Sequence, residues 1–387
     1  MSAWISTFLL VMLAAAAGAQ VPSARPQDPA TPVFAADNRV TFRIRAPKAS
    51  EVWVSTNLGG TAPKPAGTVK DQPGMWNVPL QKDATGLWTV TVGPLEPEIY
   101  RYVFLVDGVR TLDSSNPSVK PGGTLLWSYF EVAGHPPRFD EVQDVPHGSV
   151  QFRTYRVTGS KALHTVVIYV PPDYDRLPAR RFPVLYLFHS GGDSEEGWVR
   201  LGHVAAIQEN LLAQKKTVPM LVVMPYGDIE GDATAFDAID TFGREVFDDV
   251  MPLVEKNYRV VANRDNRAVA GVSVGAAQAF TLGLRNLDRF AWVGEFSAGT
   301  FTSAKFDMDK QVPGFIQNPA VANKKLKLLF LGCGTEDTRF PGHTKLNDLL
   351  EKNAVAHEFH QTPGEHEWKA WRHLLVEFMP KLFQPTK

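Results

Sequence analysis

Apolar residues in the second half of the chain gather in short continuous runs. The clearest runs cover residues 181–188, 219–224 and 327–331, and each ends in a segment rich in glycine or polar residues. Runs of this length and composition are typical of parallel strands that are buried on both faces. Residues 367–383 instead repeat their apolar positions at helical spacing. The pattern therefore predicts an α/β domain over residues 151–387, built on a doubly wound, mostly parallel sheet.

The first third of the chain has a different periodicity. Apolar and polar residues alternate with period two in four segments, and the last of these ends at Asp107-Gly108, which is a hairpin signal. Short, regularly spaced strands predict a smaller all-β, immunoglobulin-like sandwich over residues 38–133. Pro-rich segments at 20–37 and 134–150 are interpreted as linkers. The alternating segments are 40–45, 51–55, 87–92 and 100–106.

Residues 1–19 combine an apolar core with an Ala-x-Ala-like end, which predicts a signal peptide and a secreted or periplasmic protein, with no membrane span once the peptide is removed. The net charge is −1 and no basic tract stands out, so nucleic acid is not an expected partner. The single cysteine, Cys333, excludes an intrachain disulfide, and we expect it to be buried. No metal or other cofactor is expected, because the spacing of His357 and His360 does not fit a zinc motif.

One five-residue segment carries most of the chemical information. Gly271-Val272-Ser273-Val274-Gly275 lies between an apolar run and a helix-like segment of small residues. This G-x-S-x-G pattern is typical of the nucleophile elbow of an α/β-hydrolase, in which glycines allow a sharp turn that exposes the serine. The alternative is a serine that merely caps a helix. The elbow interpretation requires an acid and then a histidine further along the chain.

Both residue types follow in that order. His366 lies in a predicted loop just before the last helix, although a loop histidine is often only a surface residue. A Gly-rich loop after the 327–331 run carries two carboxylates, Glu336 and Asp337, and the residues alone do not decide between them. The order Ser, acid, His is that of the hydrolase triad.

Upstream, the 181–188 run leads into His189-Ser190-Gly191, which is similar to the loop that supplies one N–H of an oxyanion hole. Val274 would supply the other N–H, and His189 is a rival base that we interpret as structural. Because all these residues follow Gly148, the sequence predicts that hydrolysis of small esters does not need the sandwich. The residues expected to form the substrate pocket are Trp198, Tyr226, Phe242 and Trp371, beside an acidic segment, 226–240, that is either a lid or a solvated loop.

From Asp144 to the C-terminus the chain resembles carbohydrate esterase family one, the feruloyl and acetylxylan esterases, which are related to esterase D and the enterochelin esterases. The matching segments include 169–172, 183–187, 219–225, 266–273 and 363–368. The resemblance implies Ser273 as nucleophile, Asp337 as acid and His366 as base. Ser190 and Glu365 stand where the family usually has glycine, which leaves the substrate in question more than the chemistry.

The N-terminal part resembles the starch-binding-type sandwich that precedes many such esterases. Its tryptophans would then either stack on sugar rings or pack in the core. We expect an exported serine carboxylic-ester hydrolase that acts on feruloyl or acetyl esters of plant polysaccharide. The alternatives are a siderophore (enterochelin-type) or general short-acyl esterase, and a catalytically idle carbohydrate-binding protein. The tryptophans are Trp53, Trp76, Trp88 and Trp127.

Overall fold

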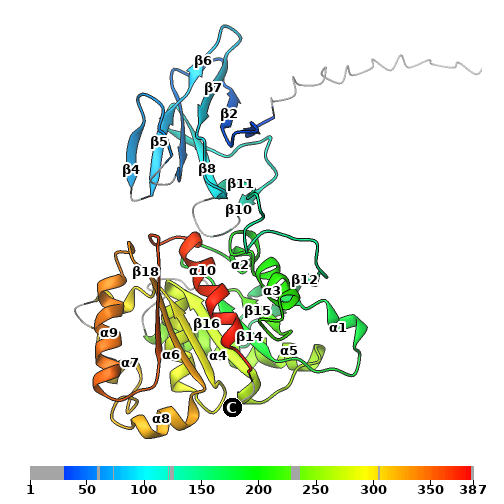
Figure 1. Cartoon of the computed structure of the whole chain (residues 1–387), viewed down its shortest axis with the longest axis vertical. Coiled ribbons are helices and arrows are strands. Elements are labelled where there is room, and N and C mark those ends of the chain that lie inside the picture. Colours follow the sequence, from blue (N-terminus) through cyan, green and yellow to red (C-terminus); the bar gives the residue numbers. More distant parts are fainter. Residues whose placement is uncertain are drawn as a thin grey trace, which may run out of the picture.

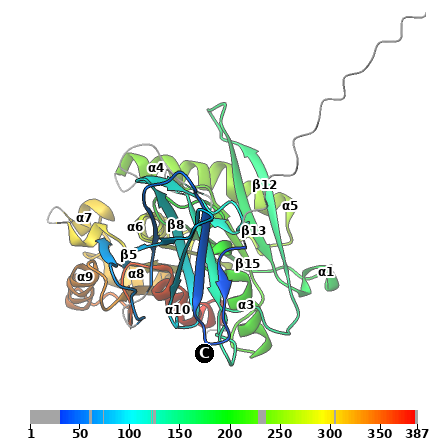
Figure 2. The same cartoon turned by 90° about the horizontal axis from the view of Figure 1, so that it is seen from above.

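The structure is a computed structural model that describes residues 30–58, 62–72, 74–120, 122, 126–227, 236–303 and 306–384. Figure 1 shows an N-terminal part made of β-strands stacked above a C-terminal α/β part along the long axis of the molecule. Figure 2, seen from above, shows that the strands of the N-terminal part lie over the α/β part. The predicted signal peptide, 1–19, and residues 228–235 of the acidic segment lie outside the described residues.

The N-terminal part consists of two antiparallel sheets, as the period-two pattern predicts. Alternate residues of their strands form one core, in which Phe42, Tyr102 and Phe104 are completely buried. Asp107 and Gly108, both with positive φ, form the predicted hairpin turn between β8 (Glu98–Val106) and β9 (Val109–Thr111). The first sheet has the order β1 (Val33–Phe34), β2 (Val40–Arg45), β7 (Leu87–Val92), β6 (Gln81–Lys82). The second has the order β10 (Val119–Lys120), β11 (Trp127–Val132), β8 (Glu98–Val106), β3 (Val52–Thr56), β5 (Met75–Pro79), β4 (Val69–Gln72), with β9 (Val109–Thr111) paired to β8.

The predicted linkers are partly structured. Strand β1 lies within the segment 20–37 and pairs with β2, so the sandwich begins earlier than the composition indicates. The segment 134–150 is fastened to the α/β part, because Asp140 forms an ion pair with Arg372 and Asn210 donates hydrogen bonds to the carbonyl oxygens of Phe139 and Glu141. A high proline content indicates that a segment lacks regular secondary structure. It does not show whether side-chain contacts fix that segment to the rest of the protein.

The α/β part is built on an eight-stranded sheet, of which the last six strands are parallel. The two antiparallel strands stand at one edge, where β12 pairs with β13 and β13 with β15. The order is β12 (Ser149–Arg156), β13 (Leu163–Val170), β15 (Leu221–Pro225), β14 (Val184–Phe188), β16 (Arg267–Val272), β17 (Trp292–Phe296), β18 (Leu328–Gly334), β19 (Glu358–Thr362). This is the predicted doubly wound, mostly parallel arrangement.

Both faces of this sheet are covered, which explains why its inner strands, such as β14, β15 and β18, are buried without alternation. In β14, Val184, Tyr186 and Phe188 join one core, which also contains α6 and α9, whereas Leu185 and Leu187 join the other, which contains α3 and α10. The helices are α1 (Asp173–Arg176), α2 (Gly197–Arg200), α3 (Val204–Ala213), α4 (Phe236–Glu245), α5 (Met251–Asn257), α6 (Val274–Arg285), α7 (Met308–Gln311), α8 (Pro319–Lys325), α9 (Phe340–Lys352) and α10 (Trp368–Phe378). A π-helical segment, Val246–Val250, joins α4 to α5, and 3-10 turns lie at Arg264–Asn266, Thr300–Thr302 and Met379–Lys381.

Within the described ranges, none of the helices has the length and apolar character needed to cross a membrane. The predicted C-terminal helix, 367–383, is present as α10 and ends five residues earlier than the pattern indicates, in a 3-10 turn.

Candidate active site

Ser273 stands at the junction of β16 and α6 in a backbone conformation that L-amino acids rarely adopt, with φ 56° and ψ −111°. The turn is possible because the residues on both sides, Gly271 and Gly275, have no side chain. At each of them other backbone atoms lie too close for a Cβ. A Cβ on Gly271 would come within 2.3 Å of the Gly275 carbonyl oxygen, and a Cβ on Gly275 within 2.3 Å of the His189 carbonyl oxygen. Strain of this kind persists where the surrounding structure enforces it, and it is common at active sites. The geometry is that of a nucleophile elbow.

Three predicted residues from separate strands meet at this elbow. Ser273 Oγ lies 2.9 Å from His366 Nε2, and His366 Nδ1 lies 2.7 Å from Asp337 Oδ2. Since the Asp337 carboxylate can only accept, Nδ1–H donates to it, which leaves Nε2 to accept from the serine hydroxyl. Asp337 follows β18, and His366 lies between β19 and α10. The carboxyl ends of three parallel strands, β16, β18 and β19, therefore bring the three residues together at one edge of the sheet.

The surroundings lower the pKa of both ionisable groups, His366 and Asp337. Burial lowers the pKa of His366 below its ordinary value, and the opposing hydrogen bond and charge of Asp337 do not restore it. Burial alone would raise the pKa of Asp337, but the hydrogen bond and charge of His366 and the N–H of Arg339 lower it. Near neutral pH, His366 is thus available as a neutral base beside an ionised carboxylate.

The rival candidates have other partners. Glu336 is exposed and accepts a hydrogen bond from the Gly364 N–H, so the structure places Asp337, and not Glu336, against His366. His189 lies with Nδ1 2.8 Å from the Ser190 carbonyl oxygen and accepts a hydrogen bond from the Gly227 N–H at Nε2 (3.0 Å). Both of its nitrogens are engaged with backbone, which agrees with a structural role. Cys333 is buried as predicted, and burial raises the pKa of its thiol.

The predicted oxyanion loop lies beside the elbow. A Cβ on Gly191 would come within 2.8 Å of Val274 Cγ2, so the two segments expected to supply backbone N–H groups are in contact. A glycine at position 191 permits this approach, which a side chain would prevent. Ser190 directs its hydroxyl toward the Gly191 carbonyl oxygen at 3.4 Å.

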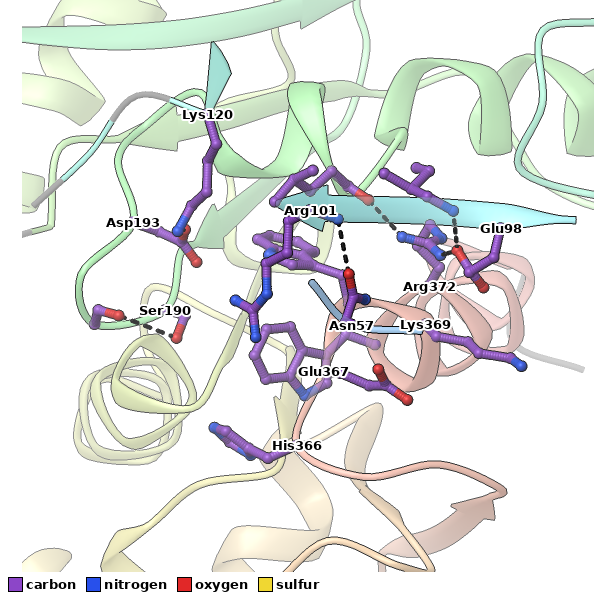
Figure 3. A pocket seen from close by; sticks show the side chains of 15 residues that line it. Asn57, Glu98, Arg101, Lys120, Ser190, Asp193, His366, Glu367, Lys369 and Arg372 are labelled. Atoms are coloured by element: carbon purple, nitrogen blue, oxygen red, sulfur yellow. Dashed lines mark hydrogen bonds and ion pairs between the residues drawn. The ribbon is translucent and has the colours of Figure 1, made fainter. Parts of the chain in front are cut away.

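A cavity of about 220 Å³ opens beside His366, between the sandwich and the α/β part (Figure 3). Residues of the α/β part form one side of it, including Ser190, Gly191, His366 and Trp371. The other side comes from the sandwich, whose contributions are Asn57, Glu98, Ile99, Arg101 and Lys120. These sandwich residues could not be found from the sequence, because nothing in a β-sandwich pattern indicates which end of the strands faces another domain.

The four predicted pocket aromatics have different environments. Trp371 lines the cavity, and its ring lies edge-on to the His366 imidazole, with centroids 4.9 Å apart. Trp198 and Phe242 are not among the residues that line this cavity: the buried Trp198 indole donates to the Phe188 carbonyl oxygen, and the buried Phe242 packs on the Phe188 ring. Tyr226 is half-buried and packs on the ring of His164. An aromatic residue near a motif is more often core than lining.

The four tryptophans of the sandwich also differ in how deeply they are buried. Trp88 and Trp127 are buried, whereas Trp53 and Trp76 are half-buried on the sheet of β3 and β5. Lys64 lies over the Trp76 ring at 4.4 Å from its centroid. Sugar stacking by the sandwich remains a prediction for Trp53 and Trp76 only. Among the described residues, no group of three or more His, Cys, Asp or Glu side chains is arranged to hold a metal ion.

Comparison with known families assigns the α/β part. The family model described as "Putative esterase" matches residues 160–382, which is more than half of the chain. The chain belongs to this esterase family. The matched range contains the elbow, the oxyanion loop, Asp337 and His366, so the α/β part is an esterase domain.

Individual relatives agree with this assignment. The chain is 30% identical over 363 residues to an endo-1,4-beta-xylanase/feruloyl esterase of Xylanibacter ruminicola, covering 91% of this chain and 46% of that protein. It is 26% identical over 246 residues to a Mycobacterium tuberculosis esterase, covering 53% of this chain and 52% of the relative. The chain thus spans about half the length of these curated relatives.

Solved structures show the same fold. The enterobactin esterase from Shigella flexneri, solved in the presence of enterobactin, covers 90% of this chain and 93% of its own, with a TM-score of 0.59 and 18% identity. A CE1 ferulic acid esterase from Anaeromyces mucronatus, in complex with ferulic acid, covers 63% of this chain and 94% of its own, with a TM-score of 0.55 and 21% identity. The first match extends over the sandwich as well as the esterase domain.

Proposed function

We propose that this protein is a serine carboxylic-ester hydrolase in which Ser273, His366 and Asp337 form the catalytic triad. The observation that carries the proposal is the continuous line of hydrogen bonds from Ser273 Oγ through both imidazole nitrogens to Asp337, built on a strained elbow. A serine that only capped helix α6 would not need the imidazole, and no side-chain cap bond to the helix is present. The esterase family to which the chain belongs gives this geometry its reaction class.

The mechanism follows from the positions of these groups. His366 Nε2 takes the proton of Ser273 as Oγ attacks the ester carbonyl carbon, and Asp337 stabilises the imidazolium that forms. The carbonyl oxygen becomes an oxyanion that the N–H groups of Val274 and Gly191 would bind, and loss of one such donor costs about 3 kcal/mol of transition-state stabilisation. The alcohol leaves with the proton from His366. Water then attacks the acyl-serine, again with His366 as base, and releases the acid.

For the substrate, we propose feruloyl or acetyl esters of plant polysaccharide. The name of the Xylanibacter ruminicola relative, which combines xylanase with feruloyl esterase, and the ferulic acid esterase structures support this choice. The polar, charged cavity beside His366 is suited to the hydroxyl-rich alcohol part of such an ester. A siderophore or general short-acyl ester is the second candidate, favoured by the enterobactin esterase, which matches both parts of this chain.

A direct test uses a fluorophosphonate probe and 4-nitrophenyl acetate. Wild-type protein should carry the probe on Ser273 and hydrolyse the acetate, and Ser273→Ala should abolish both while retaining the fold, because the triad acts as a unit. A catalytically idle, carbohydrate-binding protein would show neither labelling nor turnover. Labelling at another residue would overturn the triad. Feruloylated and acetylated oligosaccharides, compared with enterobactin, would then separate the substrate candidates.

We also propose that the protein is exported, which rests on the apolar segment and Ala-x-Ala-like end of residues 1–19. Expression of the full chain in a bacterial host and N-terminal sequencing of the periplasmic and culture fractions would test this. A mature protein that begins close to Gln20 is expected. Full-length protein confined to the cytoplasm would contradict it.

A further inference from the structure

The cavity beside His366 contains an unusual number of charged side chains, most of which are paired. Lys120 forms an ion pair with Asp193, Arg372 forms one with Glu98, and Lys369 Nζ lies 3.6 Å from Glu96. Arg101 is different, because its guanidinium forms no ion pair or side-chain hydrogen bond with the described residues. Figure 3 shows this guanidinium extending from β8 into the cavity toward His366.

The position of Arg101 is fixed by its backbone. Its N–H donates to Asn57 Oδ1 at 2.7 Å, and three residues earlier Glu98 of the same strand is held by Arg372 of α10. The Arg101 guanidinium carbon lies 5.4 Å from the centre of the Trp127 ring, so the side chain leaves the strand along an aromatic face. The half-buried Arg101 guanidinium is therefore held in position before any ligand binds. A ligand of opposite charge would pair with it without further ordering of the side chain.

The electrostatic surroundings of Arg101 also favour the binding of an anion. Burial lowers the pKa of Arg101, and the nearby carboxylates of Asp193 and Glu367 oppose that effect only in part. Asp193 is already neutralised by Lys120. Burial raises the pKa of Glu367, which also lines the cavity, and so disfavours the charged form of that carboxyl. The balance leaves a local excess of positive charge.

The position of the cavity next to His366 indicates which part of the ester it would bind. His366 returns its proton to the departing alcohol, so groups that line a cavity next to His366 contact the alcohol part of the ester. We propose that Arg101 of the sandwich is a carboxylate-binding subsite for this alcohol part, so that the protein prefers esters whose alcohol carries an acidic group, such as a uronate. This inference rests on the proposed esterase function and adds a specificity that the triad does not determine.

Two substrates that differ only in one charge provide the test. The acetyl ester of 4-hydroxybenzoate carries a carboxylate on its leaving group, and the acetyl ester of methyl 4-hydroxybenzoate is its neutral counterpart. We expect Arg101→Gln to lower kcat/KM for the acid about 10- to 100-fold more than for the methyl ester, because it removes hydrogen bonds between two charged groups. The different intrinsic reactivities of the two esters cancel when variants are compared. Arg101→Lys should keep part of the preference.

Arg110→Gln is the matched control. The Arg110 guanidinium carbon lies 4.4 Å from the centre of the same Trp127 ring, but Arg110 is exposed and does not line the cavity, so this variant should treat both esters as wild type does. A second measurement is inhibition of 4-nitrophenyl acetate hydrolysis, in which glucuronate should inhibit wild type more strongly than glucose does, and Arg101→Gln should remove the difference.

The proposal is overturned if Arg101→Gln slows both esters equally, if glucuronate inhibits wild type no more strongly than glucose does, or if Arg110→Gln shows the same change. Failure of the proposed function gives a different result. In that case wild type and Ser273→Ala would be equally inactive on 4-nitrophenyl acetate, whereas failure of the subsite alone leaves wild type active and without charge preference.

Discussion

Lys120 of the sandwich forms a buried ion pair with Asp193, which lies in the loop that carries Ser190 and Gly191. Lys120 Nζ also lies 3.4 Å from the carbonyl oxygen of Gly192, and a Cβ on Gly122 would come within 2.6 Å of the Asp193 backbone. The proposed oxyanion loop is thus held from outside its own domain. The position of one N–H donor depends on the contact between the two parts.

We predict that Lys120→Met destabilises the protein by about 3 to 5 kcal/mol, because it leaves Asp193 charged, buried and unpaired. The same variant should lower kcat for 4-nitrophenyl acetate, since the loop loses its support. Urea denaturation and steady-state kinetics measure the two effects. Arg39→Gln is the control, because Arg39 and Asp37 are more than half exposed and such pairs contribute about 0–1 kcal/mol. Wild-type stability and turnover in Lys120→Met would contradict the bracing role.

A double variant sharpens this test. In Lys120→Met with Asp193→Asn, the unpaired charge is gone, so part of the stability should return relative to Lys120→Met alone. If the oxyanion loop is still misplaced, kcat should remain low even though stability recovers. Recovery of both together would show that the slow turnover of the single variant came from partial unfolding.

The identity of the triad acid gives a second prediction. Asp337→Asn should lower kcat roughly 10⁴-fold, because an amide at this position favours the wrong imidazole tautomer. Glu336→Gln should have a small effect, since Glu336 is exposed and its contact is with the Gly364 N–H. Steady-state kinetics on 4-nitrophenyl acetate compare the two variants. A larger loss in Glu336→Gln than in Asp337→Asn would move the acid to Glu336.

Much of this site could be predicted from the sequence because its residues lie in local signals. Gly271, Ser273 and Gly275 encode a turn that few other residues could form, and His366 follows a strand and precedes a helix. The choice between Glu336 and Asp337 could not be made from the local pattern. Both are carboxylates on the same loop, and only the folded backbone determines which of the two side chains points toward His366. The family resemblance favours Asp337, and the structure shows its carboxylate turned toward His366.

The role of the sandwich is the part that the sequence analysis did not anticipate. Arg101 and Lys120 lie in an alternating β pattern that predicts a strand and its two faces, but the end of a sandwich that meets another domain is set by contacts distant in sequence, such as that between Glu98 and Arg372. The expectation that small-ester hydrolysis is independent of the sandwich therefore changes. A chain that begins near Asp144 would lose Lys120 and one wall of the cavity, and we expect slower turnover from it than from the full chain.

The strained backbone of Ser273 gives a third prediction. Its φ of 56° costs a non-glycine residue of order 1–3 kcal/mol, a cost that glycine avoids. Ser273→Gly should therefore be more stable toward urea than Ser273→Ala, although both lack the nucleophile and should be inactive. Glycine also has more conformational entropy than alanine in the unfolded chain, which lowers the stability of Ser273→Gly by about 0.5–1 kcal/mol. A Ser273→Gly variant that is more stable than Ser273→Ala would therefore show strain larger than this entropy difference, and a less stable one would contradict it.

The last prediction concerns pH. His366 must be neutral to act as base, and burial lowers its pKa, so kcat/KM for 4-nitrophenyl acetate should stay high below the ordinary histidine value of about 6.5 and fall only as the pH drops through the lowered pKa. The groups that act on this imidazole are Asp337, which raises the pKa, and Arg339 and His343, whose positive charges lower it.

Arg339→Gln tests this assignment with a defined sign. Removing the positive charge makes the imidazolium less unfavourable, so the pKa of His366 should rise and the acidic limb of the kcat/KM profile should move to higher pH. The Arg339 N–H to Asp337 Oδ1 hydrogen bond, 2.9 Å long, comes from backbone and survives the substitution. Arg200→Gln, which removes a cation paired with Glu196 on the surface of α2, should leave the limb unchanged. An acidic limb that lies above the ordinary histidine range in wild type, or moves to lower pH in Arg339→Gln, would show that another group controls the profile.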